Sequence, residues 1–306
     1  MKKSKTFLSI FVLYVILNMI IFPSLYIKQA FDGISAWAFN VLPSVLPFMF
    51  FTKVLTSLGS LNNISNVFMK PCKIFFKTHQ SSSFVFLTSI ISGYPVGAKM
   101  TADLYNQGVI TRTDAIKMCS FCSTSGPMFI IGAVGIGMLK NAAYGYIIFI
   151  CHILGALLNG LIYRNLKVKE VDERTSQSFI NKPFDLSSIV LDSALGILSV
   201  GAIISIFFVV ITSLSPIFNI FPPQIASIFK GMVEITKGCL DISNFIGNKW
   251  SIAAATFVIS FGGLSTIFQS MSMLSNVNVP FRIVLIQKLT HAIIASVLAL
   301  ILILFI

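Results

Sequence analysis

The sequence SGYPVGAK at residues 92–99 interrupts an apolar run that extends from residue 82 to residue 100. Two glycines and a proline stand within the five residues 93–97, and such a stretch does not continue a regular helix without a large free-energy cost. We therefore expect a re-entrant hairpin whose tip lies at membrane depth, where irregular backbone is tolerated only inside protein or beside a cavity. The sequence STSGP at residues 123–127 interrupts the next apolar run, residues 118–139, in the same manner.

The composition of the whole chain agrees with a membrane setting. Of its 306 residues, 56% are hydrophobic and 10% are charged, whereas soluble domains carry about 25% charged residues. Several continuous apolar runs reach the roughly 20 residues that a membrane-spanning helix needs. The chain is thus predicted to be an all-α, polytopic transmembrane protein. A soluble enzyme, a disordered chain, a disulfide-stapled domain and an outer-membrane barrel are excluded.

The net charge of +12 has two readings. In a soluble protein such a charge would indicate binding to nucleic acid. Here the basic residues fall mostly between apolar runs, where they orient helices and contact anionic lipid headgroups. We therefore expect the lipid bilayer, and not nucleic acid, to be the partner of these charges.

The apolar runs divide the chain into two halves. Residues 1–30 are predicted to be an N-terminal transmembrane helix, with the run 6–27 as one retained span. A first repeat of residues 31–163, a cytoplasmic polar linker of residues 164–185 and a second repeat of residues 186–306 follow. Within the repeats the remaining predicted segments are residues 34–58, 62–80 (amphipathic), 142–163, 186–220, 224–249 (amphipathic), 252–274 and 283–306.

The two halves resemble each other weakly. The sequence TSL occurs at residues 56–58 and again at residues 212–214. From this register, Gly93-Tyr94-Pro95 is paired with Gly262-Gly263-Leu264, and Lys117 with Lys288. Opposite directions of the two spans would make the repeats inverted, as in many secondary transporters. Unrelated helices that match by chance are the alternative.

Interrupted segments at matching places in two halves predict a transport site. A helix broken at mid-membrane is expected to expose unpaired backbone N–H groups, which carry the positive end of a helix dipole and hold an anionic or polar solute. The alternative is that the glycines only allow helices to pack closely.

Candidate substrate-binding residues follow from these breaks. Lys99 is predicted to be a buried cation that pairs with an anion if the hairpin is deep, or to reach the interface if it is shallow. Glu234 and Thr236 are candidates if their amphipathic stretch enters the bilayer; otherwise Glu234 and Lys237 form an ordinary exposed pair. The full set of candidates is Gly93, Tyr94, Pro95, Gly97, Lys99, Ser123, Thr124, Ser125, Gly126, Glu234, Thr236, Gly262, Gly263, Ser265 and Gln269.

No motif in the sequence predicts catalysis, a metal site or a cofactor. Cys119 and Cys122 form one C-x-x-C pair without a second pair or a nearby histidine. We interpret them as small residues packed between helices.

Several of these motifs carry a family resemblance. SGYPVGAK at 92–99, CSTSGP at 122–127, FGGLS at 261–265, Trp37 with LPSVLPF at 42–48, and residues 234–238 resemble the YlbJ (SpoVV) sporulation integral membrane proteins. That family belongs to the nucleoside-recognition, or Gate, group related to concentrative nucleoside transporters. The resemblance covers roughly residue 33 to the C-terminus.

The resemblance implies a multi-pass protein of the cell (inner) membrane, in a sporulating cell the outer forespore membrane, that moves dipicolinic acid. We therefore predict a transporter of a small anionic, dipicolinate-like solute, and not an enzyme. The alternatives are a nucleoside or other small-metabolite transporter and a non-transporting sporulation assembly protein. The sequence leaves a homo-oligomer open.

Overall fold

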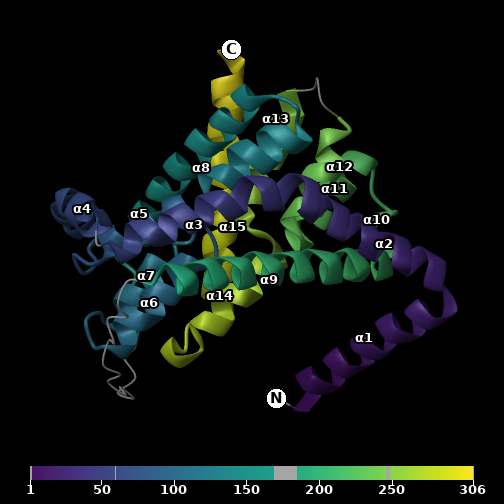
Figure 1. Cartoon of the computed structure of the whole chain (residues 1–306), viewed down its shortest axis with the longest axis horizontal. Coiled ribbons are helices and arrows are strands. Elements are labelled where there is room, and N and C mark those ends of the chain that lie inside the picture. The colour runs from purple at the N-terminus through teal and green to yellow at the C-terminus, as the bar shows by residue number, and fades with distance from the viewer. Residues whose placement is uncertain (1, 59, 169–184, 246–248, 306) are drawn as a thin grey trace.

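A computed structural model describes residues 2–58, 60–168, 185–245 and 249–305. In these ranges the regular structure is helical throughout. Figure 1 shows α2 (Pro23–Ala36) and α3 (Leu42–Ser57) running across the middle of the view beside α9 (Leu186–Ser213), with α8 (Ala142–Tyr163) and α13 (Lys249–Phe261) above them and α15 (Phe281–Leu304) packed against both. Most of the predicted polar linker, residues 169–184, lies outside the described residues.

The N-terminal run does not form one helix. Helix α1 (Lys2–Ile21) ends before Pro23, and α2 (Pro23–Ala36) starts with that proline, because a proline fits the first turn of a helix but not its interior. The chain then continues through the π-helical stretch η1 (Trp37–Val41) into α3 (Leu42–Ser57). The predicted single span over residues 6–27 is therefore wrong: its last residues belong to α2.

The rest of the first half contains both predicted interruptions. Helix α4 (Ser60–Phe76) precedes the pair α5 (Ser82–Ser92) and α6 (Val96–Asn106). The short α7 (Arg112–Met118) and the π-helix η2 (Met128–Met138) are separated by an irregular segment, and α8 (Ala142–Tyr163) completes the half.

The second half repeats this order. Helix α9 (Leu186–Ser213) and the short α10 (Ser215–Phe218) precede the pair α11 (Pro223–Val233) and α12 (Ile235–Ser243). Then come α13 (Lys249–Phe261) and α14 (Gly263–Met273), the turn η3 (Ser275–Val277) and α15 (Phe281–Leu304).

Both short helix pairs are hairpins held by glycine. A Cβ at Gly97 of α6 would lie 2.8 Å from the Ser89 Oγ of α5, and a Cβ at Gly238 of α12 would lie 2.8 Å from the backbone N of Gly231 of α11. Backbones approach this closely only where side chains are absent. The re-entrant hairpin predicted at Gly93 is present, and a second hairpin replaces the single amphipathic stretch predicted over residues 224–249.

This order changes the pairing of the halves. The α5–α6 hairpin corresponds to the α11–α12 hairpin, and the broken helix α7–η2 corresponds to the broken helix α13–α14. Gly93 therefore corresponds to the region of Glu234. The sequence register had paired Gly93 with Gly262, and that pairing is wrong. Weak similarity between apolar helices does not distinguish a hairpin tip from a helix break, because both contain glycine.

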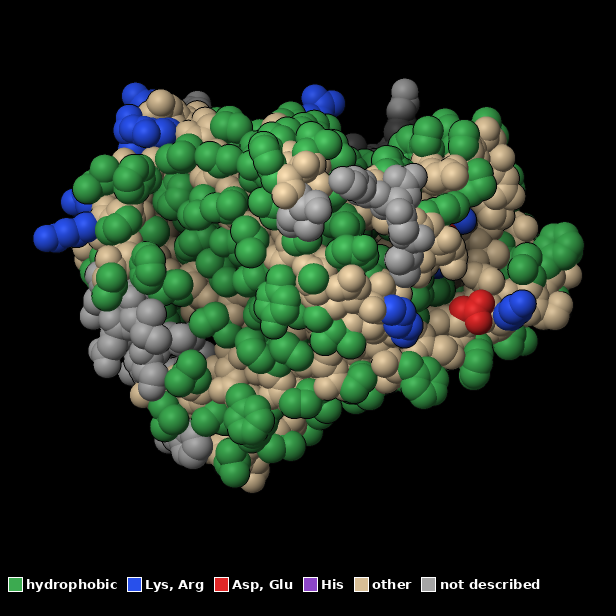
Figure 2. All heavy atoms as spheres, turned by 90° about the horizontal axis from the view of Figure 1, so that it is seen from above, with side chains coloured by type: hydrophobic (Ala, Val, Ile, Leu, Met, Phe, Trp, Pro, Cys, Tyr) green, Lys and Arg blue, Asp and Glu red, His purple; other side chains and the backbone are tan. Residues whose placement is uncertain are grey.

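Five segments among the described residues are long and apolar enough to cross a membrane: Pro23–Leu55, Ala142–Tyr163, Leu186–Ser213, Trp250–Met273 and Phe281–Leu304. Hydrophobic side chains cover most of the face in Figure 2, as expected of a surface that contacts lipid. Trp250–Met273 is 78% buried whereas the other four are at most 44% buried, so the broken helix α13–α14 is at the centre of the protein.

Candidate solute-binding pocket

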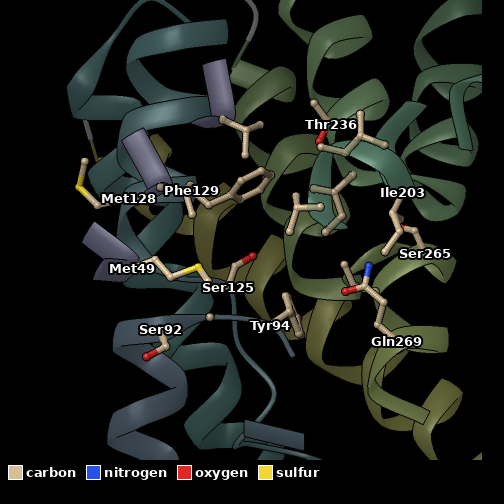
Figure 3. Close-up of a pocket in the computed structure, with 18 of the residues that line it drawn as sticks. Met49, Ser92, Tyr94, Ser125, Met128, Phe129, Ile203, Thr236, Ser265 and Gln269 are labelled. Carbon is tan, nitrogen blue, oxygen red and sulfur yellow. The ribbon is translucent and has the colours of Figure 1, made fainter. Parts of the chain in front are cut away.

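Both hairpin tips and both helix breaks meet at one pocket. Its wall contains Gly93 and Tyr94 from the first tip, Ser125 and Gly126 from the first break, and Glu234 to Thr236 from the second tip. Ser265, Thr266 and Gln269 contribute the first turns of α14. The cavity has a volume of about 100 Å³, and Figure 3 shows Ser125 and Tyr94 on the side opposite Ser265 and Gln269.

Apart from Ser92, the remaining wall of the pocket is apolar. It comes mainly from the long helices α3 and α9 and from the start of η2. These residues are Val41, Val45, Phe48, Met49, Met128, Phe129, Val200, Ile203 and Ile204, with Ile91 of α5. An apolar pocket with a few convergent polar groups is the usual form of a small-molecule site.

The first break is held by side chains from three different helices. The amide of Thr124 donates to Ser89 Oγ of α5 at 3.1 Å, and the amide of Ser125 donates to His152 Nε2 of α8 at 3.0 Å. The carbonyl of Ser123 accepts from Lys288 Nζ of α15 at 2.5 Å. The prediction that this break exposes unpaired amides is thus wrong for Thr124 and Ser125, because distant residues supply their partners.

The hydrogen bonds of His152 determine its tautomer. A backbone N–H only donates, so Nε2 accepts from Ser125 and carries no hydrogen. The hydrogen is on Nδ1, which lies 2.9 Å from Ser260 Oγ of α13. His291 stacks against this ring with centroids 4.8 Å apart, and its Nε2 donates to the His152 carbonyl at 2.9 Å. The pair is completely buried and connects the first break to α13 and α15.

Lys288 is a buried cation beside the first tip. It is 3% exposed, its Nζ donates to Tyr94 Oη at 2.8 Å, and it lies 4.3 Å from the centroid of the Tyr94 ring. Within the described residues it forms no ion pair with a carboxylate; Asp241 is the acceptor of the ion pairs that are found, with Lys230 and Lys237. An ammonium in a membrane interior without a counterion is a costly arrangement that indicates function.

The second tip is organised by its own residues. Glu234 is 3% exposed, and its extended backbone precedes α12, whose Lys237 amide donates to Glu234 Oε2 at 2.8 Å. Lys237 Nζ bonds to Asp241 Oδ1 at 2.5 Å. Glu234 is therefore an N-cap inside the pocket wall, and not half of an exposed pair with Lys237.

The second break depends on glycine backbone. Gly262 and Gly263 have φ values of 88° and 64°, a left-handed conformation that other residues adopt only with strain. Helix α14 begins at Gly263, with Gly262 as its N-cap. Two polar groups of its first turns remain without a hydrogen bond to a described residue: the buried Oγ of Ser265, which is 2% exposed, and the half-buried Gln269 amide.

The structure divides the predicted site residues into two groups. Lining the pocket are Gly93, Tyr94, Ser125, Gly126, Glu234, Thr236, Ser265 and Gln269. Outside the wall, but close in the sequence to residues that line it, are Pro95, Gly97, Ser123, Thr124, Gly262 and Gly263, whereas Lys99 is exposed away from the pocket. Of these, Gly97 packs against the Cys122 carbonyl, and Ser123 and Thr124 anchor the first break.

The prediction that Lys99 is a buried cation is wrong. Lys99 is exposed, because it lies on the face of α6 away from Gly97 and the pocket. Lys288 is the buried lysine instead. Its position within the apolar run 283–306 was a usable signal, since an ionisable residue in a span is by itself a functional candidate. His152 carried the same signal, since it lies within the apolar run 142–163, but its partners come from three other elements and are not visible in the sequence.

Comparisons with known proteins agree with this geometry. Residues 38–142 match the Gate family, which is described as nucleoside recognition. The sporulation integral membrane protein YlbJ of Bacillus subtilis (strain 168) is 27% identical over 328 residues, covering 94% of this chain and 80% of that protein. The chain is thus similar to YlbJ over most of its length. It is an integral, multi-pass membrane protein.

The fold has a match among solved structures. Two CNTnw variants in an outward-facing state superpose with TM-scores of 0.64 and 0.60 at 14% identity; they cover 99% of this chain and 86% and 85% of the matched chains. The chain thus has the CNTnw fold with inverted repeats. The predicted fold class and the predicted family resemblance are confirmed.

Proposed function

We propose that this protein transports a small, flat, anionic solute through the pocket by alternating access, with dipicolinate as the first solute to test. The observation that carries the proposal is the meeting of both hairpin tips and both helix breaks at one cavity. In inverted-repeat transporters, discontinuous helices of the two halves form the substrate site. The similarity to a sporulation membrane protein supports dipicolinate among the anions.

The charges and shape of the pocket support an anionic, planar solute. The N-termini of η2 and α14 reach the cavity at Met128 and Ser265, and helix N-termini attract negative charge. Lys288 lies directly behind Tyr94. Tyr94, Phe129 and Phe48 offer flat apolar faces on which an aromatic ring packs favourably.

A nucleoside is the second candidate, favoured by one observation. Glu234 brings a buried acceptor into the pocket wall, and a carboxylate suits solutes with hydroxyl donors better than it suits a dianion. The match of residues 38–142 to the nucleoside-recognition family points in the same direction.

Uptake into proteoliposomes tests both candidates. Purified full-length protein is reconstituted, and uptake of labelled dipicolinate is measured with unlabelled dipicolinate or uridine as competitor. We expect uptake that dipicolinate inhibits and uridine does not. Inhibition by uridine would favour the nucleoside, and absence of uptake of either solute would contradict transport. Lys99→Ala is the matched control, because Lys99 is exposed outside the pocket.

A further inference from the structure

Lys288 has features that a purely structural lysine does not need. Its ammonium is buried, lies in the interior of a span and makes its two hydrogen bonds to neutral acceptors, Tyr94 Oη and the Ser123 carbonyl. A neutral donor would satisfy the same two acceptors without the cost of desolvating a charge. The two hydrogen bonds alone therefore do not explain why a lysine, and not a neutral donor, stands at this position.

The surroundings of Lys288 do not neutralise it. The titratable side chains within its electrostatic reach are Cys119 at the end of α7, His152 on α8 and His291 on its own helix. None of the three is a carboxylate, and both imidazoles act as neutral hydrogen-bonding groups toward backbone. In an apolar interior, an uncompensated charge acts over a longer distance than in water.

The field of Lys288 reaches the pocket through one residue. Tyr94 lines the cavity with part of its surface, and the ammonium lies 4.3 Å from the centroid of its ring and 2.8 Å from its hydroxyl oxygen. The hydroxyl accepts from Lys288, so its own hydrogen is free to donate elsewhere. The Tyr94 side of the pocket thus combines a hydroxyl donor of the first half with the nearby ammonium of Lys288, whereas the carboxyl group of Glu234 lies at the second hairpin tip.

We propose that Lys288 is the positioning residue that gives the pocket its selectivity for a carboxylate, with the carboxylate bound on the Tyr94 side of the cavity. The inference rests on the proposed transport function and adds the residue that determines the charge of the solute. Lys288 acts through Tyr94 and does not itself line the pocket. A solute carboxylate supplies the counterion that the folded chain does not.

The experiment compares two solutes of the same ring and nearly the same shape, one a dianion and one neutral. Dipicolinate and its neutral diamide are tested against Lys288→Met, which keeps the length of the side chain, Lys288→Arg, which keeps its charge, and Lys99→Met as an exposed control. Two quantities are measured with each full-length protein: uptake into proteoliposomes, and the shift in melting temperature that each solute causes in detergent.

We expect Lys288→Met to lower the preference for dipicolinate over the diamide by about tenfold or more, as expected for loss of a nearby charge in a low-dielectric site. Lys288→Arg should restore most of this preference, and Lys99→Met should leave it unchanged. An unaltered preference in Lys288→Met, or an equal loss for both solutes, would overturn the proposal, because a merely structural lysine affects both solutes alike.

The two measurements separate this inference from transport itself. Binding of dipicolinate that depends on Lys288, in a protein without uptake, would support the role of Lys288 and contradict the proposed transport. Uptake of dipicolinate that does not depend on Lys288 would support the proposed transport and contradict the role of Lys288. A wild-type protein that neither binds nor transports dipicolinate would overturn both.

Discussion

The two halves of the chain form opposite walls of one pocket, and they hold their broken segments in different ways. In the first half, three consecutive residues of the break between α7 and η2 are bound by Ser89 and His152 of the same half and by Lys288 of the second half. In the second half, Glu234 caps its own helix, and the break before α14 relies on Gly262 and Gly263. The first wall is fixed by distant helices, whereas the second wall is organised locally.

This difference suggests a division of roles between the walls. Hydrogen bonds from several elements preorganise the first wall, which lowers the ordering cost of solute binding. Among the described residues, the second wall has a buried hydroxyl without a hydrogen-bond partner, Ser265 Oγ, and a half-buried amide, Gln269. Gln269 is the one of the two that a solute in the pocket reaches directly, and a wall held mainly by local contacts changes position with less loss of free energy.

The largest effect is expected from the close glycine contacts of the hairpins. In Gly97→Ala the new Cβ would collide with the Cys122 carbonyl oxygen, which is backbone and does not yield. We expect a loss of about 3 kcal/mol of stability, measured as a lower melting temperature in detergent, together with loss of uptake. Gly238→Ala, which faces the backbone of Gly231, should have a similar effect in the second half.

Gly196→Ala is the control for these variants, because its new Cβ would meet only the flexible end of Met49. A Gly97→Ala protein with an unchanged melting temperature would show that the first hairpin is not pressed against the first break. The proposed rigidity of that wall would then lose its basis.

A smaller loss of stability should follow from removing the His152 anchor. His152→Leu leaves the Ser125 amide and the Ser260 hydroxyl buried without partners, at a cost of about 1–3 kcal/mol each for such groups. His152→Gln, which offers both an acceptor and a donor, should recover part of the stability that His152→Leu loses. Melting temperatures measure the effect, and the exposed His79→Gln is the control. Equal stability of the Leu and Gln variants would argue against the anchor.

Glu234 allows the charge of the second wall to be changed with little effect on the fold. Glu234→Gln keeps an acceptor for the Lys237 amide, so its stability should stay close to wild type, whereas Glu234→Ala loses the cap at a cost of about 1 kcal/mol. Melting temperatures of the two variants check this difference.

The same variant distinguishes the two candidate solutes. In Glu234→Gln the KM for a dianion should fall several-fold, because a carboxylate at this position repels a dianion. The KM for uridine should rise, because the carboxylate accepts hydrogen bonds from the hydroxyl groups of uridine. Uptake kinetics with both solutes measure the direction in which each KM changes. Identical changes for both would mean that Glu234 does not contact the solute.

The smallest effect on stability is expected at Ser265. Its hydroxyl is buried without a hydrogen-bond partner among the described residues, so Ser265→Ala should leave the stability unchanged or raise it by up to about 1 kcal/mol. Ser89→Ala, which removes hydrogen bonds to the amide and hydroxyl of Thr124, should instead lower the stability. A destabilised Ser265→Ala protein would contradict the contrast between the walls.

Much of the site could be predicted from local sequence. The tip at Gly93 and the breaks at Ser123–Pro127 and Gly262–Gly263 are visible because clustered glycine and proline interrupt a helix, and a bilayer tolerates such interruptions only inside protein or beside a cavity. Lys99 was misassigned, because periodicity within a short helix does not indicate which face meets the rest of the protein. The pairing of Gly93 with Gly262 failed because hairpin tips and helix breaks use the same residues.

The sequence alone determined that this chain is a helical, multi-pass membrane protein with interrupted segments in both halves, since long apolar runs admit few other structures in a bilayer. Only the tertiary structure decided which groups meet at the cavity. His152, Lys288 and Ser89 reach one three-residue strip from three helices, and such convergence depends on how helices pack against each other, which no local pattern of residues encodes.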